Sequence, residues 1–244
     1  MSLISRIVAV FTLAGFAVAC SADESPSTPV EGKTNGEKWW RGNYERINAD
    51  IKKMDGKIDV AFVGDSITAR WNGDLWKKHW GAYRAVNMGI GGDRTQNVLW
   101  RLENGQLDGY EARVFVVMIG TNNCWEKTAD PADVAAGVKA VVKLIQTKQP
   151  KAKILLMSIL PTGEKPNPGR EKRAAVNALI SKLAGGGVEY LDIGEKFLET
   201  DKTISKEVMG DFLHLAPKGY DIWAEAITGK IKDIVKEPNA GAKP

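Results

Sequence analysis

The stretch Val60-Ala61-Phe62-Val63-Gly64-Asp65-Ser66 decides the fold, because an unbroken apolar run ends there in a glycine, an acid and a serine. A run that is apolar at consecutive positions is typical of a strand covered on both faces, here over 58–63. Four more such runs alternate with amphipathic segments, at 84–87, 114–119, 153–159 and 188–191. This alternation predicts an α/β fold, with a parallel sheet and helices on both of its faces.

The predicted helices have recognisable ends. Asp130 is a candidate N-cap, and Pro131 follows at the first helical position. Apolar residues then mark one face of the segment 134–145. A last helix is predicted over 217–235. Because ligands bind at the carboxyl ends of strands in such sheets, that edge is where functional side chains are expected.

The N-terminus, residues 1–19, has the layout of an export signal. Arg6 precedes an apolar stretch that is too short to span a bilayer. The stretch ends at Ala17-Val18-Ala19, which fits ordinary signal cleavage, but Cys20 resembles the lipid-bearing cysteine of a bacterial lipoprotein, although Ala17 departs from the usual leucine. We favour lipidation. Either alternative places the mature protein outside the cytoplasm, anchored to a membrane through Cys20 or secreted or periplasmic.

Composition divides the rest of the chain. Residues 20–37 are rich in Ser, Pro, Thr and Gly and are predicted to be a flexible tether, followed by one folded domain over 38–236 and a disordered tail over 237–244. The net charge of +4 comes from scattered lysines, so nucleic acid is not an expected partner. With Cys20 lipidated, the one cysteine left is Cys124, and no internal disulfide can form.

Two histidines, His79 and His214, are candidates for a general base. His79 lies in a predicted helix and is interpreted as a structural residue. His214 follows the last strand in a loop, three residues after Asp211, which can orient the imidazole. Ser66 ends the first strand and is the candidate nucleophile, with Ser158 at the end of the fourth strand as the next candidate. The alternative is that all of these polar residues cap turns and helices.

Two further strand ends offer donors for an oxyanion. Gly92 lies in the glycine-dense turn 87–93, whose amides can approach a ligand closely. Asn122 and Asn123 follow the third strand, and the side-chain amide of either can donate. No Gly-x-Ser-x-Gly elbow surrounds Ser66, which disfavours the lipase-type α/β-hydrolase architecture.

Together these residues resemble the SGNH, or GDSL, hydrolase superfamily. Its four blocks occur in order as Gly64-Asp65-Ser66, Gly92, Asn122 and Asp211-x-x-His214. Longer matches make the chain similar, within that superfamily, to the catalytic subunits of intracellular platelet-activating factor acetylhydrolase. They are Asn87-x-Gly-Ile-Gly-Gly-Asp93, Val98-Leu-Trp-Arg-Leu102, Gly120-Thr-Asn-Asn123, 161–168 and Asp211-Phe-Leu-His-Leu215.

The resemblance implies a three-layer α/β/α flavodoxin-like fold with a five-stranded parallel sheet, no metal and no cofactor. It implies hydrolysis of short-chain acyl esters through an acyl-serine intermediate, with Ser66, Asp211 and His214 as the catalytic residues. The oxyanion donors would be the backbone amides of Ser66 and Gly92 and the side chain of Asn122, with the neighbouring Asn123 ranked second. The export signal departs from the intracellular subunits, so their substrate and partner proteins are not carried over.

The substrate expected from these observations is an acetyl or other short acyl ester, with acetylated glycans favoured for an exported enzyme. Trp71 and Trp125 can line the mouth of the site and stack on a sugar ring, or they can be core or rim residues. A lysophospholipase or thioesterase is the alternative enzyme, and an inactive glycan-binding relative is the alternative from another class. The oligomeric state stays open.

Overall fold

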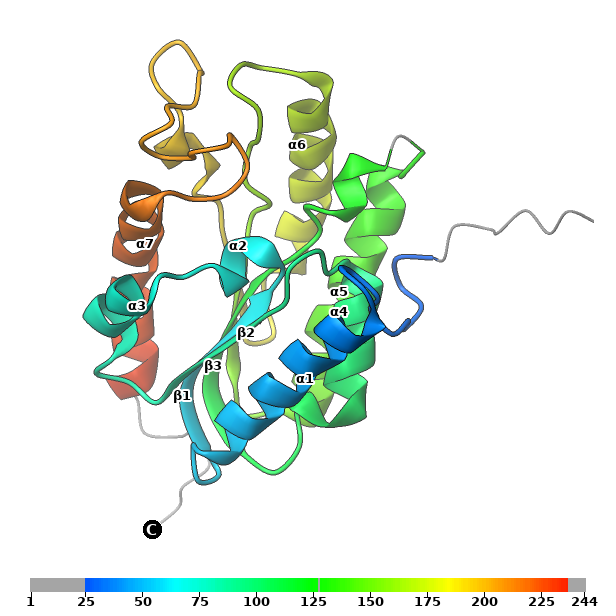
Figure 1. Ribbon diagram of the computed structural model, residues 1–244, viewed down its shortest axis with the longest axis vertical. Helices are drawn as coiled ribbons and strands as arrows, with labels where there is room; N and C mark the ends of the chain where they lie inside the picture. The colour runs from blue at the N-terminus through cyan, green and yellow to red at the C-terminus, as the bar shows by residue number, and fades with distance from the viewer. Residues whose placement is uncertain (1–24, 127, 237–244) are drawn as a thin grey trace, which may run out of the picture.

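Five parallel strands form one sheet in the computed structural model, which describes residues 25–126 and 128–236 (Figure 1). Their order is β2-β1-β3-β4-β5, the flavodoxin-like order. The sheet confirms the predicted fold class, and the strand bounds differ from the predicted ones by up to three residues. The strands are β1 Lys57–Gly64, β2 Ala85–Gly89, β3 Glu111–Met118, β4 Lys153–Met157 and β5 Val188–Leu191.

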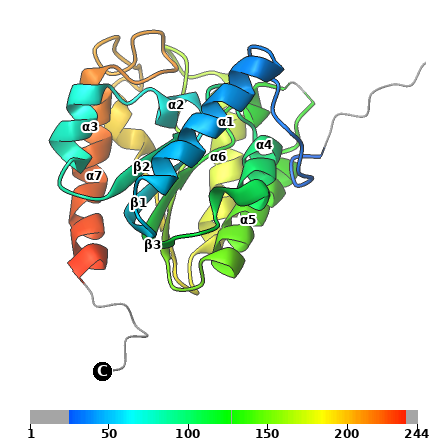
Figure 2. The ribbon, with the colours of Figure 1, turned by 60° about the horizontal axis from the view of Figure 1, so that its bottom comes forward.

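Helices cover both faces of this sheet (Figures 1 and 2). One face carries α1 (Glu37–Lys52), α4 (Thr95–Arg101), α5 (Pro131–Lys148) and α6 (Pro168–Ile180). The other face carries α3 (Gly73–Trp80) and α7 (Pro217–Lys236). Short elements complete the chain: α2 (Ser66–Ala69), a π-helical turn η1 (Leu102–Gln106), and the 3₁₀ turns η2 (Asn123–Trp125), η3 (Ser181–Leu183) and η4 (Gly194–Phe197).

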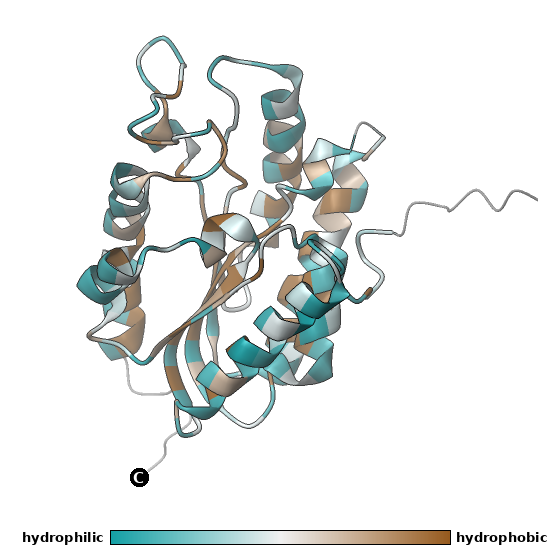
Figure 3. Ribbon diagram, viewed as in Figure 1, coloured by the Kyte–Doolittle hydropathy of each residue, from teal (hydrophilic) through white to brown (hydrophobic). Residues whose placement is uncertain are grey.

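The core consists of two apolar layers separated by the sheet, whose strands form the apolar centre in Figure 3. Successive side chains of β1 point to opposite faces. Ala61 and Val63 therefore pack with the helices of the first face, whereas Val60 and Phe62 pack against α3 and α7. Burial on both faces explains why the strand is apolar at consecutive positions.

The caps expected at the start of α5 are present. The Asp130 carboxylate accepts a hydrogen bond from the amide of Ala132 at 2.7 Å, and Pro131 is the first helical residue. The same arrangement begins α6, where the Asn167 side chain accepts from the amide of Arg170 at 3.2 Å. These caps fix where the helices start relative to the strand ends.

Within residues 25–36, which were predicted as part of a flexible tether over 20–37, Pro26 and Val30 are hydrogen-bonded to the first turn of α4. The Val30 amide donates to the Gln96 carbonyl at 3.1 Å, and the Asn97 side-chain amide donates to the Val30 carbonyl at 3.1 Å. The Thr95 hydroxyl donates to the Pro26 carbonyl at 2.7 Å. These contacts are polar and far apart in sequence, so apolar periodicity could not reveal them.

Three predictions lie outside the described residues: the export signal over 1–19, Cys20 and the tail over 237–244. Within residues 25–126 and 128–236, no helix has both the length and the apolar character needed to cross a membrane.

Candidate active site

Ser66 lies where β1 turns into α2. Gly64 ends the strand, and a Cβ atom there would lie 2.2 Å from the Thr68 hydroxyl and 2.5 Å from the Met118 carbonyl, so only glycine fits. Asp65 is the N-cap, and its carboxylate accepts a hydrogen bond from the Ile67 amide at 2.9 Å. Ser66 is thus the first residue of a helix, where backbone amides are free to face a ligand.

The three residues predicted as a catalytic triad lie in one hydrogen-bonded chain. His214 Nε2 is 3.0 Å from Ser66 Oγ, and His214 Nδ1 is 2.7 Å from an Asp211 carboxylate oxygen. These positions come from opposite ends of the domain, 148 residues apart. The arrangement lets the imidazole accept the serine proton while the carboxylate holds the other ring nitrogen.

The turn that carries Asp211 and His214 is tight. The second role of the Asp211 carboxylate is to accept hydrogen bonds from the backbone amides of Leu213, at 3.1 Å, and His214, at 2.7 Å. Phe212 has a φ of 58°, a left-handed conformation that is uncommon for a residue with a bulky side chain. Partial burial works to raise the pKa of Asp211, but hydrogen bonds from the His214 ring and the two amides lower it to about 2. The carboxylate is therefore ionised at neutral pH.

The predicted oxyanion donors lie beside this triad. Gly92 and Asn122 line the same pocket as Ser66 and His214, with a volume of about 350 Å³. Gly92 has a φ of 78°, which glycine adopts without strain. The Asn122 side-chain amide donates one proton to the Asp93 carbonyl at 2.8 Å and keeps a second proton for a ligand.

Asn123, the neighbour ranked second, has a different position. It is buried, its carbonyl oxygen accepts from the Thr95 amide at 3.0 Å, and its amide donates to the Gln96 side chain at 3.0 Å. The side chain thus joins η2 to α4. Of the two asparagines, Asn122 is the one that lines the pocket at Ser66.

The model of the GDSL-like lipase/acylhydrolase family matches residues 62–222, which span β1 through the start of α7. The chain belongs to this family. It is therefore an ester-hydrolysing enzyme, and its α/β sheet positions the family's motif residues at one edge.

Known relatives of this GDSL hydrolase agree with its assignment to the family. The platelet-activating factor acetylhydrolase IB subunit alpha2 of Homo sapiens is 45% identical over 207 residues, which cover 83% of this chain and 87% of that protein. Two solved structures share the fold at lower identity. A GDSL-like lipase from Bacteroides thetaiotaomicron has a TM-score of 0.65 and 21% identity, covering 78% of this chain and 98% of that one. A catalytic mutant of Axe2, an acetylxylan esterase from Geobacillus stearothermophilus, has a TM-score of 0.57 and 20% identity, covering 72% and 94%.

A buried ionic network behind the site of this GDSL hydrolase was missed by sequence reasoning. The Asp93 carboxylate accepts from Trp40 Nε1 at 2.6 Å and from Arg101 Nε at 2.8 Å. Arg101 also donates to the Gly64 carbonyl at 3.1 Å. Burial raises the pKa of Asp93 to about 6 despite the charge of Arg101. The Asp93–Arg101 pair connects the turn before Ser66 to the loop of Gly92. The sequence signal for this pair was an arginine inside the apolar run 98–102, because a buried arginine needs a partner of opposite charge.

The two tryptophans considered for the mouth of the site, Trp71 and Trp125, differ in burial in the structure of the GDSL hydrolase. Trp71 is only 7% exposed and packs on Tyr220 and Trp223, at ring-centroid distances of 4.5 Å and 5.4 Å. It is a core residue, which was one of the two alternatives that the sequence left open; its aromatic neighbours come from α7, far along the chain. Trp125 is 56% exposed and lines a cleft together with Asn122.

The remaining candidates have structural contacts. His79 Nε2 lies 2.6 Å from the Asp221 carboxylate and so joins α3 to α7. Ser158 is fully buried, and its hydroxyl accepts from the Ile193 amide at 3.3 Å. Neither lines the pocket at Ser66. Among residues 25–126 and 128–236, no three His, Cys, Asp or Glu side chains converge as metal ligands.

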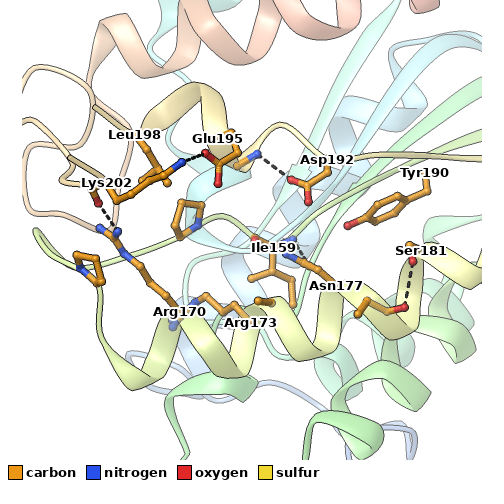
Figure 4. Close-up of a pocket in the computed structure, with 15 residues that line it drawn as sticks. Ile159, Arg170, Arg173, Asn177, Ser181, Tyr190, Asp192, Glu195, Leu198 and Lys202 are labelled. Carbon is orange, nitrogen blue, oxygen red and sulfur yellow. Dashed lines mark hydrogen bonds and ion pairs between the residues drawn. The ribbon is translucent and has the colours of Figure 1, made fainter. Parts of the chain in front are cut away.

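A larger pocket of this GDSL hydrolase, about 590 Å³, lies between α6 and the segment that follows β5 (Figure 4). Its polar side chains mostly hold the structure together. Arg170 donates to the carbonyls of Thr162 and Lys202, and Lys202 pairs with Glu195 at 2.5 Å. Neither Ser66 nor His214 lines it, so size alone does not identify the reactive site.

Proposed function

We propose that this enzyme hydrolyses acetyl and other short-chain acyl esters through an acyl-serine intermediate on Ser66. The observation that carries the proposal is the hydrogen-bonded chain Ser66–His214–Asp211, with Gly92 and Asn122 facing the same pocket. A nucleophile, a base, an orienting carboxylate and oxyanion donors are the parts that acyl transfer requires.

The proposed reaction has two halves. In the first, His214 Nε2 takes the Ser66 proton, and Oγ attacks the ester carbonyl carbon. The backbone amides of Ser66 and Gly92 and the side chain of Asn122 donate to the oxyanion, which then collapses to release the alcohol with the proton from His214. In the second half, water loses its proton to His214 and attacks the acyl-serine, which releases the carboxylic acid and restores Ser66. Asp211 stays ionised throughout, as its low pKa requires.

The size of the pocket supports a short acyl group. A volume of about 350 Å³ lies at the small end of ligand pockets, and Ala69 and Leu213 are among the few apolar side chains in its lining. The relative that is 45% identical is named an acetylhydrolase. The test is the rate on acetyl, butyryl and octanoyl p-nitrophenyl esters, which we expect to fall steeply with length. Equal or rising rates at octanoyl would favour the lysophospholipase or thioesterase alternative.

For the alcohol part we propose a carbohydrate. One neighbour with the same fold is an acetylxylan esterase, and the surroundings of Gly92 and Asn122 are polar. Acetyl release from acetylated xylan and pectin, measured beside the simple esters, tests this choice. Failure of an organophosphorus reagent to label Ser66 would instead support the inactive glycan-binding alternative.

We also propose that the chain is exported and attached to a membrane through lipid on Cys20. The support is the sequence alone: an apolar stretch over 7–19 that ends in small residues before Cys20. The wild-type protein is expected in the membrane fraction of the producing bacterium, and Cys20→Ala in the soluble fraction. Soluble wild-type protein after signal processing would show ordinary secretion.

A further inference from the structure

A second cleft, about 460 Å³ in volume, opens beside the proposed oxyanion donors. Thr34, Gly92 and Asn122 line both this cleft and the pocket at Ser66, so the two spaces adjoin at these residues. The cleft is lined by residues of the docked segment 30–34, by the start of α4 and by Trp125. An ester whose carbonyl oxygen lies at Gly92 and Asn122 thus has room for a large group on this side.

Trp125 presents an aromatic surface to the cleft. Its ring is 56% exposed, although most large apolar side chains of the domain are buried. The guanidinium of Arg173 lies over the ring, 5.0 Å from its centroid, and Arg173 itself is only 2% exposed. A cation beneath an aromatic ring holds it in place. The ring is therefore a supported platform that a flat molecular face can cover.

Apart from Val30, the other side chains of the cleft are polar, and two of its three charged side chains are paired nearby. Glu31 pairs with Arg41 at 2.6 Å, and Arg94 pairs with Glu126. The side chain of Asn97 is held by the backbone of Val30 and of Arg94. Lys33 is the third charged side chain of the lining and is exposed. Because two of the three charges are matched, the cleft offers mainly hydrogen-bonding groups, which suit a hydroxyl-rich ring.

We propose that this cleft binds the sugar ring of the leaving alcohol, stacked on Trp125 with its hydroxyl groups facing the polar side chains of segment 30–34 and α4. The proposal rests on the ester hydrolysis proposed above and names the subsite that selects the alcohol. It also gives the segment 30–34 a role in specificity, since residues of that segment line the cleft together with Trp125.

The test compares two acetyl esters that differ in their alcohol: an acetylated xylo-oligosaccharide and ethyl acetate, which has no ring. We expect Trp125→Ala to lower kcat/KM for the oligosaccharide by about tenfold, mainly through KM, because stacking binds substrate and transition state alike. Ethyl acetate should be cleaved at the wild-type rate, which also shows that the variant is folded. Trp125→Phe, which keeps a platform, should recover most of the loss.

Trp39→Ala is the matched control. Trp39 is 42% exposed and lines the pocket at Ser66 but not the cleft, so its removal should leave the ratio of the two rates unchanged. If Trp125→Ala left the ratio of the two rates unchanged, or if both tryptophan variants changed that ratio equally, the sugar subsite would be wrong. The proposed function would still stand in that case, provided that ethyl acetate was cleaved. A wild-type enzyme that cleaves an acetyl phospholipid but no acetylated sugar would overturn it in favour of a phosphate-bearing alcohol. Failure on every ester would refute the proposed function itself.

Discussion

Replacing Asn122 and Asn123 one at a time separates catalysis from stability at adjacent positions. Asn122→Ala removes one proposed oxyanion donor and one hydrogen bond, to the Asp93 carbonyl, at a half-buried position that water can reach. The loss of one such donor costs about 3 to 4 kcal/mol of transition-state stabilisation. We therefore expect kcat to fall about 100- to 1,000-fold with KM nearly unchanged. The free energy of unfolding should fall by no more than about 1 kcal/mol.

Asn123→Ala should show the opposite pattern. It leaves the buried amide of Thr95 without a partner and removes the shorter of the two hydrogen bonds to the Gln96 side chain, which keeps the Thr95 hydroxyl at 3.4 Å; an unsatisfied buried group costs about 1 to 3 kcal/mol. The free energy of unfolding should thus fall by about 2 kcal/mol or more. The folded fraction of this variant should keep a kcat within about tenfold of wild type, because the side chain does not face the pocket.

The assay is initial-rate kinetics on p-nitrophenyl acetate beside urea unfolding of the same preparations. The reasoning is refuted if Asn122→Ala keeps more than about a tenth of the wild-type kcat, since the loss of a donor to the transition state should lower kcat by more than that. It is equally refuted if Asn123→Ala loses kcat as severely as Asn122→Ala does at full folding.

Four other substitutions test the site and its surroundings. Ser66→Ala should abolish acyl-enzyme formation, seen as loss of the burst phase and of organophosphorus labelling; a turnover above a few per cent would disprove the assignment. Asp211→Asn should lower kcat by up to about 10,000-fold, because it favours the wrong tautomer of His214, and an unchanged kcat would remove Asp211 from the triad. Burial raises the pKa of Asp65 from 3.8 to about 7, so the folded state binds a proton that the unfolded state releases, and stability should fall as pH rises between those values. Asp65→Asn keeps an oxygen for the cap and should reduce that slope in urea unfolding from pH 4 to 7, leaving the part due to Asp93, whose pKa is also raised; an identical slope would contradict the burial argument. Arg101→Met should lower the free energy of unfolding by about 3 to 5 kcal/mol, because its partner carboxylate is left buried without a cation, and a loss below about 1 kcal/mol would show that the network contributes little.

The sheet and the placement of the site could be predicted because both depend on local patterns. Consecutive apolar residues identify a strand covered on both faces, and carboxyl ends of parallel strands meet at one edge, which brings Ser66 and Asn122 together. The choice between Asn122 and Asn123 came from the family resemblance. Sequence spacing alone could not decide between them, because which of the two adjacent side chains faces the pocket depends on how the backbone turns after β3.

Features that depend on distant partners could not be read from the sequence. The composition of residues 25–36 is that of a linker, and only contacts with α4 show that the segment is docked. Trp71 could be assigned to the core only once α7 was known to pack on it. The pairing of Asp93 with Arg101 likewise needs the turn of α4, although a lone arginine in an apolar run signals a buried partner.

Docking of the N-terminal segment changes how far the enzyme can stand from an anchoring point. A free chain from Cys20 to Glu37 could extend about 60 Å, whereas the stretch from Cys20 to Ser25, where the described residues begin, spans at most about 18 Å. If Cys20 carries lipid, the catalytic domain is then held within a few nanometres of the bilayer. Such an enzyme cannot diffuse away from the membrane, so polymers or oligomers must come close to the membrane surface to be deacylated.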